Sequence, residues 1–473
     1  MSLIPTIITE PSIGQQAYLK HLQTAGPDAI PDYVTISIDM DELHREAVGK
    51  TISFFVKRHE SLRTVFPLID DEVKQAVVDY DEQRFGVEYI AVGTSDVFSP
   101  AVKEECFERA GRIFSDIQNG PLVKFFVFKE TSDGYRFYML IHHIICDGWS
   151  IELIGRELRL LYQFYASGIE PDIAPLNFQL RDYCRKQNEW LRGSRDALER
   201  FWKNRVSGYD SLFNINNFYE GYLQRGNEKL LRTETGRENM SIDDLLRTYR
   251  HPKALARNST VSGDRFTNMK MLAGANHCTI SSIVYASLYI FLFCYTDKQR
   301  ILLAALIADR FTQENQLLIG CLLGGVYFPR EIAGHCTIND FISETFRDVF
   351  ANCRNIIPSH EYLHLDAVKL HVSTDIYINY QQEQDRLAPD KEESEEHYEI
   401  PGIFYPLDFM ITEYTDGLHF KWKYNKLLFE EELIDDMIQC YDDVLDFIAF
   451  NGDKTLGEAC AYSKTANRPL PEL

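Results

Sequence analysis

Residues 138–150 of this chain read Tyr138-Met139-Leu140-Ile141-His142-His143-Ile144-Ile145-Cys146-Asp147-Gly148-Trp149-Ser150. The apolar run before the two histidines predicts a buried strand, and Asp147-Gly148 predicts a turn. A helix should start directly afterwards, because residues 150–164 carry apolar side chains at helical spacing. Titratable side chains at the end of a strand, beside a turn, indicate a functional site.

The two histidines differ in what they can do. Side chains alternate between the faces of a strand, so only one of His142 and His143 can point into a given site. An imidazole with a reference pKa of about 6.5 can take a proton from a nucleophile, and a backbone N–H can stabilise a negative oxygen. Plain packing or an ion-pair network with Asp147 would produce the same pattern. A metal site is not expected, because zinc needs about three protein ligands and these histidines diverge.

The sequence on both sides alternates between strand and helix patterns. Before the histidines we expect helices at 12–22 and 41–59, and strands at 33–38, 122–129 and 135–144. Asp39 or Asp41 should cap the second helix, and a turn at 131–134 should join the last two strands. After the histidines we expect helices at 150–164, 178–206, 279–295, 338–353 and 430–450, and strands at 300–307, 374–379, 405–413 and 418–424. Residues 207–263 show no readable pattern.

The length and this alternation predict an α/β (α+β) protein with two lobes. A chain of 473 residues exceeds one ordinary hydrophobic core. The Gly- and Pro-rich segment 168–175 favours a connection between lobes. We therefore expect an N-terminal lobe at 1–172 that carries the histidines and a C-terminal lobe at 173–473.

Composition narrows the class of partners. The 49 basic and 71 acidic residues give a net charge of −22, which disfavours nucleic-acid and membrane binding. The acidic segment 382–400 is expected to be a solvated loop. None of the ten cysteines forms a CxxC pair, and the start of the chain lacks the pattern of a signal peptide. We therefore expect a reduced, cytoplasmic protein, in which the apolar stretch 283–295 is a buried helix too short to span a bilayer.

Residues 142–148 resemble the HHxxxDG signature of nonribosomal-peptide-synthetase condensation domains, and further segments resemble that family in the same order. These segments are Arg58-His59-Glu60-Ser61-Leu62-Arg63-Thr64-Val65-Phe66, Asp182-Tyr183 with Trp190-Leu191, Ala308-Asp309-Arg310, Ile319-Gly320, His360-Glu361 and Tyr424-Asn425-Lys426-Leu427-Leu428-Phe429. The chain departs from the pattern at Leu19, where Trp is usual, and at Gly324-Gly325, where the family has an Asn-Thr pair. A divergent member with an unusual substrate or acceptor is expected.

The resemblance implies two chloramphenicol-acetyltransferase-like lobes arranged as a V-shaped pseudo-dimer with a central tunnel. It also implies that the acyl donor arrives on the phosphopantetheine arm of a carrier protein, that the acceptor is either free or carried in the same way, and that the chain itself binds no cofactor. His143 matches the catalytic histidine, as base or as positioner of the amine, and His142 would support it. Asp147 would form a structural ion pair with an arginine, for which Arg310 is the first candidate and Arg63 the second.

Three neighbours complete the expected site. Gly148 would permit the turn and present its backbone N–H. Ser150 would support the loop, and Trp149 is expected in the core rather than against substrate. For Arg310 and Arg63 the sequence leaves two roles open, a structural ion pair or a direct role in the site.

Three functions are compatible with these residues. The first is a condensation enzyme that joins a carrier-bound acyl thioester to a small amine or aminoacyl group in nonribosomal peptide or related biosynthesis, either free-standing or as an excised domain. The second is an ester-forming or CoA-dependent acyltransferase of the same fold. The third is a non-catalytic module that docks a partner protein, which the complete histidine motif disfavours.

Overall fold

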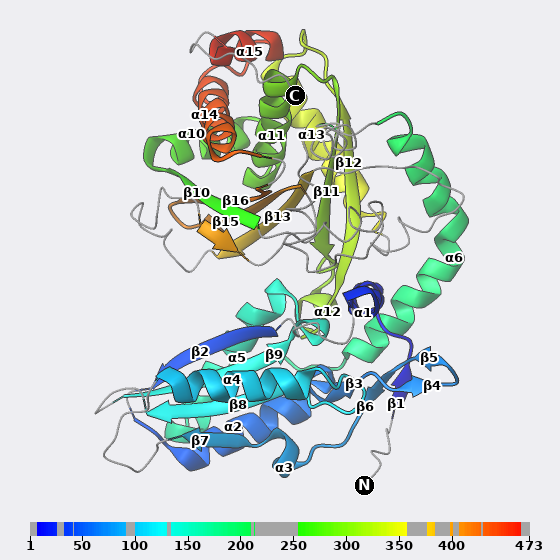
Figure 1. The fold of residues 1–473 in the computed structure, drawn as a ribbon, viewed down its shortest axis with the longest axis vertical. Helices are drawn as coiled ribbons and strands as arrows, with labels where there is room; N and C mark the ends of the chain where they lie inside the picture. Colours follow the sequence, from blue (N-terminus) through cyan, green and yellow to red (C-terminus); the bar gives the residue numbers. More distant parts are fainter. Residues whose placement is uncertain are drawn as a thin grey trace, which may run out of the picture. The chain divides into compact units, whose positions relative to one another are not determined.

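The computed structural model describes residues 7–25, 33–40, 42–90, 100–129, 134–209, 212, 254–356, 376–383, 398–400, 406–426 and 429–464. The chain divides into two compact units. The first contains the described residues up to Ala197 together with Ile307–Gly324. The second contains the remaining described residues. Both units combine helices with sheet (Figure 1).

The first unit is built on a four-stranded sheet of order β2-β9-β8-β7. Its strands are β2 (Tyr33–Met40), β9 (Tyr135–His142), β8 (Val123–Lys129) and β7 (Val87–Ile90). β8 and β9 pair antiparallel, as the predicted hairpin requires, although most of its turn lies outside the described residues.

Alternate side chains of this sheet form two hydrophobic cores. Phe125 and Met139 pack with α2 (Arg45–Arg58) and α5 (Gly148–Ser167) on one face. Phe126 and Leu140 pack with α4 (Pro100–Phe114) on the other face. Because the strands are apolar on both faces, the sheet is a buried layer, and residues at the end of β9 emerge from a rigid support.

Smaller elements complete the first unit. A three-stranded sheet has the order β1-β6-β3 and a two-stranded sheet joins β4 to β5. The elements are α1 (Ile13–Ala25), β1 (Ile7–Thr9), η1 (Glu60–Arg63), β3 (Thr64–Val65), β4 (Leu68–Ile69), β5 (Glu72–Val73), β6 (Gln75–Val77), α3 (Glu82–Phe85), η2 (His143–Ile145) and α12 (Gln313–Gln316). The boundary between the units falls inside α6 (Leu180–Val206).

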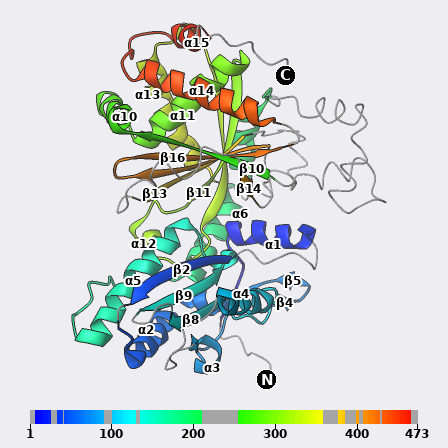
Figure 2. The same cartoon turned by 60° about the vertical axis from the view of Figure 1, so that its left-hand side comes forward.

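The second unit has a seven-stranded sheet of order β12-β11-β13-β15-β16-β10-β14. Its strands are β10 (Ala254–Ser262), β11 (Arg300–Ala308), β12 (Leu323–Glu331), β13 (Ile376–Glu383), β14 (Tyr398–Ile400), β15 (Leu407–Tyr414) and β16 (Gly417–Asn425). Its helices are α10 (Gly263–Ala275), α11 (Ile280–Thr296), α13 (Ile338–Cys353), α14 (Glu431–Ile448) and α15 (Leu456–Lys464). These helices gather on one side of the sheet in both ribbon views (Figures 1 and 2).

Helix α11 is the centre of the second unit, as its apolar sequence predicts. Most of its side chains are buried, and it packs against α13, α14 and α15. Thr279 caps its N-terminus by accepting a hydrogen bond from the Ser282 N–H. Among the described residues, no individual helix combines the length and the hydrophobicity of a membrane span. Only α10 and α11 taken together reach both, and the angle between these two helices is 104°.

The predicted cap of the second helix is wrong. The helix expected at 41–59 begins at Arg45 behind His44, which forms no side-chain cap, whereas Asp39 lies in β2 and pairs with Arg136. Asp41 lies outside the described residues. Asp39 therefore lies too far from the start of the helix at Arg45 to cap it, and its carboxylate pairs across the sheet with Arg136 instead.

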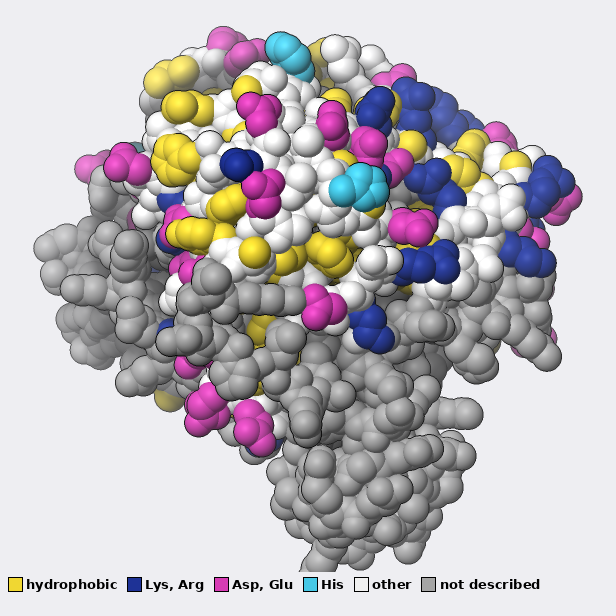
Figure 3. All heavy atoms as spheres, turned by 90° about the horizontal axis from the view of Figure 1, so that it is seen from above, with side chains coloured by type: hydrophobic (Ala, Val, Ile, Leu, Met, Phe, Trp, Pro, Cys, Tyr) yellow, Lys and Arg dark blue, Asp and Glu magenta, His cyan; other side chains and the backbone are white. Residues whose placement is uncertain are grey.

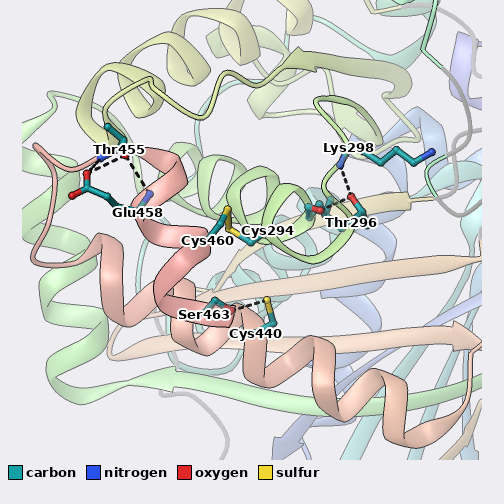
Figure 4. The surroundings of a disulfide bond; sticks show 9 residues. Cys294, Thr296, Lys298, Cys440, Thr455, Glu458, Cys460 and Ser463 are labelled. Carbon is teal, nitrogen blue, oxygen red and sulfur yellow. Dashed lines mark hydrogen bonds between the residues drawn. A yellow bond between two sulfur atoms is a disulfide. The ribbon is translucent and has the colours of Figure 1, made fainter. Parts of the chain in front are cut away.

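The expectation of fully reduced cysteines is also wrong. Cys294 of α11 and Cys460 of α15 form a disulfide across 166 residues of sequence, with their Cα atoms 4.6 Å apart (Figure 4). Cys440 of α14 lies beside them, with its Sγ 3.2 Å from the Ser463 Oγ. No short cysteine motif marks this pair in the sequence, because only the packing of α15 against α11 brings the two cysteines together.

Candidate functional site

The two histidines occupy different environments although they are adjacent. His142 is the last residue of β9, and His143 begins the short 3-10 helix η2. His142 is buried, whereas His143 is half-buried. The strand ends between them, and of the two histidines only His143 retains access to solvent.

The ring of His143 is oriented by a backbone carbonyl. Its Nδ1 lies 2.9 Å from the carbonyl oxygen of Cys146. A carbonyl oxygen only accepts hydrogen bonds, so Nδ1 carries the proton. In the neutral ring, the Nε2 lone pair is consequently free to accept a proton, which is the requirement for a general base.

His142 is held as a neutral group. Its Nδ1 accepts a hydrogen bond of 3.1 Å from the N–H of Ile144, so the proton of its neutral ring lies on Nε2. Burial, with the neighbouring His143, lowers its pKa to about 3. The rings of Tyr18 and Phe114 pack against it at centroid distances of 5.4 and 6.2 Å. His142 is therefore part of the hydrophobic interior that supports His143.

Asp147 forms the predicted ion pair with Arg310. Both carboxylate oxygens lie 2.7 Å from the Arg310 Nη2, and both side chains are buried. Asp147 also caps α5 by accepting hydrogen bonds from the Ser150 N–H and Oγ–H. The Leu322 N–H donates to its second oxygen at 3.1 Å. These contacts fasten the start of α5 to residues 310–322.

Arg310 and Ser150 extend the same network. Arg310 Nη1 donates to the carbonyls of Asn315 and Leu318 at 2.6 Å each. Ser150 Oγ accepts from the Gly320 N–H at 3.1 Å and lies 3.2 Å from its carbonyl oxygen. The motifs at 308–310 and 319–320 therefore meet the histidine motif within one unit, although about 160 residues of sequence separate them.

The remaining predicted site residues have clear positions. Gly148 is the first residue of α5. Trp149 is 45% exposed, so its predicted place in the core is wrong: it lies on the outer side of the first turn, and its Nε1–H donates to the Gln316 carbonyl. Arg63 does not bind Asp147; its guanidinium donates to the carbonyls of Val56 and Val78.

Sequence reasoning missed Glu157 as the partner of the motif that begins at Arg58. Its carboxylate lies 2.8 Å from the His59 Nε2 and 3.1 Å from the Arg58 Nε. Burial raises the pKa of Glu157, but hydrogen bonds and charges from His59 and Arg58 outweigh it and lower the pKa. The sequence does carry a signal for this residue: Glu157 lies on the apolar face of an amphipathic helix, where residues 154, 158 and 161 are buried. A buried acidic side chain needs a partner, so its position on this face predicts one.

Other predicted segments are partly described. The Tyr183 hydroxyl donates to Asp309, which joins α6 to the end of β11. Trp190 is 40% exposed. The segments at residues 360–361 and 427–428, and the acidic residues 384–397, lie outside the described residues.

A separate cavity of about 250 Å³ lies in the second unit. It is lined by Arg205, Tyr209, Pro329, Arg330, Glu331, Glu344 and Asp348. Its two arginines pair with Asp348, and Arg330 also pairs with Glu344.

Figure 3 shows a face on which basic side chains gather toward one side with acidic ones among them. Across the described ranges, no cluster of three or more His, Cys, Asp or Glu residues has the geometry of a metal site.

Comparisons with known proteins agree with this fold. A family model described as the condensation domain matches residues 34–470. One of the subunits of linear gramicidin synthase from Brevibacillus parabrevis is 26% identical over 317 residues, which cover 66% of this chain and 4% of that protein. Phosphinothricin tripeptide synthetase PhsB of Streptomyces viridochromogenes is 24% identical over 395 residues, which cover 80% of this chain and 30% of that protein.

Solved structures show the same fold at low identity. The condensation domain of the Monacolin K polyketide synthase MokA has a TM-score of 0.70 at 17% identity, covering 96% of this chain and 100% of that one. The X-domain from teicoplanin biosynthesis, solved in complex with OxyB, has a TM-score of 0.66 at 14% identity, and 97% of each chain is covered. The α/β class and the chloramphenicol-acetyltransferase-like fold are thus confirmed.

The mixed α/β fold and the buried network around a histidine motif define a condensation-type architecture. The chain belongs to the condensation domain family, as the motifs predict. It spans only a small part, 4%, of the length of the matching gramicidin synthase protein.

Proposed function

We propose that this chain is a condensation enzyme that forms an amide bond. In the proposed reaction an amine, free or as a carrier-bound aminoacyl group, attacks the carbonyl of an acyl thioester on a carrier protein. The C–N bond forms and the C–S bond breaks. His143 Nε2 takes the proton of the amine, or orients that amine, and the proton leaves on the thiol of the phosphopantetheine arm.

The single observation that carries the proposal is the orientation of His143. Its Nδ1–H donates to the Cys146 carbonyl, so Nε2 of a half-buried imidazole is the free basic atom. The acyl group arrives already activated as a thioester, so the reaction needs no serine or cysteine nucleophile.

Gly148 and the ion pair have supporting roles in this proposal. As the first residue of α5, Gly148 has a backbone N–H without an acceptor within the helix, which suits it to stabilise a negative oxygen. Asp147 and Arg310 hold the loop that carries both groups. The carboxylate of Asp147 is occupied by Arg310, Ser150 and Leu322, so its role is structural.

Membership of the family and the names of the relatives support a carrier-bound donor. Two of those relatives are named as synthetases of gramicidin and of a phosphinothricin tripeptide. An ester product and an acyl-CoA donor use the same histidine chemistry, so products must distinguish them. The X-domain solved with OxyB makes partner docking a third outcome to test.

The test is a product assay. The enzyme is mixed with an acyl group on a phosphopantetheinylated carrier protein and with an amine or an alcohol as acceptor, and the products are identified by mass spectrometry. Wild type should form the amide, and His143→Ala should lose at least about 100-fold of the rate, a typical contribution of a general base. His335, a histidine of the second unit outside the network, provides the control His335→Ala. Equal rates for His143→Ala and wild type would reject the mechanism, and product from alcohols or acyl-CoA alone would reject amide formation. Binding of carrier or partner protein without turnover would indicate docking.

A further inference from the structure

Tyr18 is the one residue of α1 whose ring contacts both histidines in the described structure. It packs edge to face on His142 at a centroid distance of 5.4 Å and an interplanar angle of 74°. The same ring lies 6.4 Å from the centroid of His143, tilted by 41°. Helix α1 as a whole packs against η2, the element that His143 begins. One side of the His143 environment is therefore formed by α1.

Helix α1 is fixed in this position by buried contacts. The Ser12 Oγ–H donates to the Cys321 carbonyl at 2.8 Å, and the Ile13 N–H donates to Gln187 at 2.8 Å. Gly14 allows a close approach to residues 321–323, because a Cβ there would lie 2.7 Å from the Leu323 carbonyl oxygen. The same segment binds Asp147 through the Leu322 N–H. Tyr18 is thus held by the framework that holds the histidine loop.

We infer that Tyr18 is a positioning residue for His143, an inference that rests on the proposed function. The hydrogen bond to Cys146 anchors the His143 ring at Nδ1, and a half-buried imidazole anchored at one edge can still leave its rotamer. The bulk of the Tyr18 ring limits this movement on the side of α1. It keeps Nδ1–H on the Cys146 carbonyl and so keeps Nε2 available to the nucleophile.

The test separates the ring of Tyr18 from its hydroxyl and from plain stability. Tyr18→Phe keeps the ring and should retain kcat within about threefold. Tyr18→Ala removes the ring and should lower kcat by about 10- to 100-fold with a small change in KM, the size expected when a catalytic group is misplaced by about 1 Å. Tyr89→Ala is the matched control, since Tyr89 is a half-buried tyrosine of the same unit whose ring packs with Arg45.

A second readout does not depend on activity. With 15N-labelled histidine, the hydrogen-bonded Nδ1–H of His143 should give a slowly exchanging NMR signal, assigned by its loss in His143→Ala. The signal should persist in Tyr18→Phe and Tyr89→Ala and disappear in Tyr18→Ala. A Tyr18→Ala protein that keeps both the signal and kcat overturns the inference. If Tyr18→Ala fails to fold, Tyr18→Leu takes its place. If His143→Ala is fully active the proposed function fails, while the NMR signal still decides whether Tyr18 positions the ring.

Discussion

Replacing Arg310 by methionine should destabilise the first unit far more than the loss of an exposed ion pair. The substitution keeps an apolar stem of similar length but removes the guanidinium that binds both oxygens of Asp147. The Asp147 carboxylate is fully buried, so it cannot recover the lost interaction from water. It would keep only the donors of Ser150 and Leu322.

The expected cost follows from this burial. Breaking a buried ion pair by removing one partner typically costs about 3–5 kcal/mol, because the other charge stays desolvated. Arg310 also donates to the carbonyls of Asn315, Leu318 and Gly320, and each of these carbonyls would lose that donor. We therefore expect about 4 kcal/mol for Arg310→Met. The double variant Asp147→Asn with Arg310→Met should cost less than the sum of the single variants by at least about 1 kcal/mol, since the charge is gone.

Urea unfolding followed by tryptophan fluorescence measures these free energies. Lys186→Met is the matched control, because Lys186 pairs with Glu314 at 3.2 Å but both side chains are more than half exposed. Such pairs contribute about 0–1 kcal/mol. A cost for Arg310→Met as small as that for Lys186→Met would refute the reasoning. So would strict additivity in the double variant.

Three further predictions test the histidine, the approach of α1 and the disulfide. Burial and the neighbouring His143 lower the pKa of His142 to about 3, so between pH 6.5 and 3 the unfolded state binds this proton and the folded state does not. The free energy of unfolding should therefore fall by about 2 kcal/mol between pH 7.5 and 5. In urea unfolding, His142→Asn should lose about 2 kcal/mol less than wild type over this pH range, and the same loss in both proteins would contradict the assignment. Gly14→Ala should destabilise the protein by about 1–3 kcal/mol, because the added Cβ would clash with the Leu323 carbonyl. Its control is Gly49→Ala in α2, where a Cβ would have no neighbour within 4 Å and should stabilise the protein by about 0.5–1 kcal/mol. Equal melting temperatures of the two variants would reject this explanation. Alkylation of the denatured, unreduced protein should modify eight of the ten cysteines and spare Cys294 and Cys460, and modification of all ten, measured by mass spectrometry, would exclude the disulfide.

Strongly periodic segments could be predicted from the sequence. The helix predicted at 338–353 matches α13, and the strands predicted at 405–413 and 418–424 pair antiparallel as β15 and β16. Amphipathic or fully apolar runs determine such elements through burial, so the pattern is enough. Helix α4, strands β10 and β12, and helix α10 were not predicted. Strand β10 reads Ala-Leu-Ala-Arg-Asn-Ser-Thr-Val-Ser, and its pairing with β16 rather than its own residues makes it a strand.

The candidate site was predictable only where a motif is local. His142, His143 and Asp147 lie within six residues, and the strand-turn-helix pattern around them was visible. The partner of Asp147 required a resemblance, because Arg310 is 163 residues away. Neither Glu157 nor Tyr18 was singled out, since their contacts depend on how helices pack on the sheet. The exposure of Trp149 was mispredicted because the burial tendency of indole does not describe the first turn of a helix.

The hydrogen bonds of the site separate two tasks that a catalytic triad combines in one carboxylate. In a triad, the acid holds the histidine tautomer and stabilises its charged form. Here the neutral carbonyl of Cys146 fixes the tautomer of His143, while the carboxylate of Asp147 is engaged with Arg310, Ser150 and Leu322. A carbonyl orients the ring but offers an imidazolium less electrostatic stabilisation than a carboxylate does. Such an arrangement suits the proposed reaction, in which an amine attacks an already activated thioester. In that proposal His143 only has to orient the amine or briefly accept its proton, and it does not have to generate an alkoxide nucleophile.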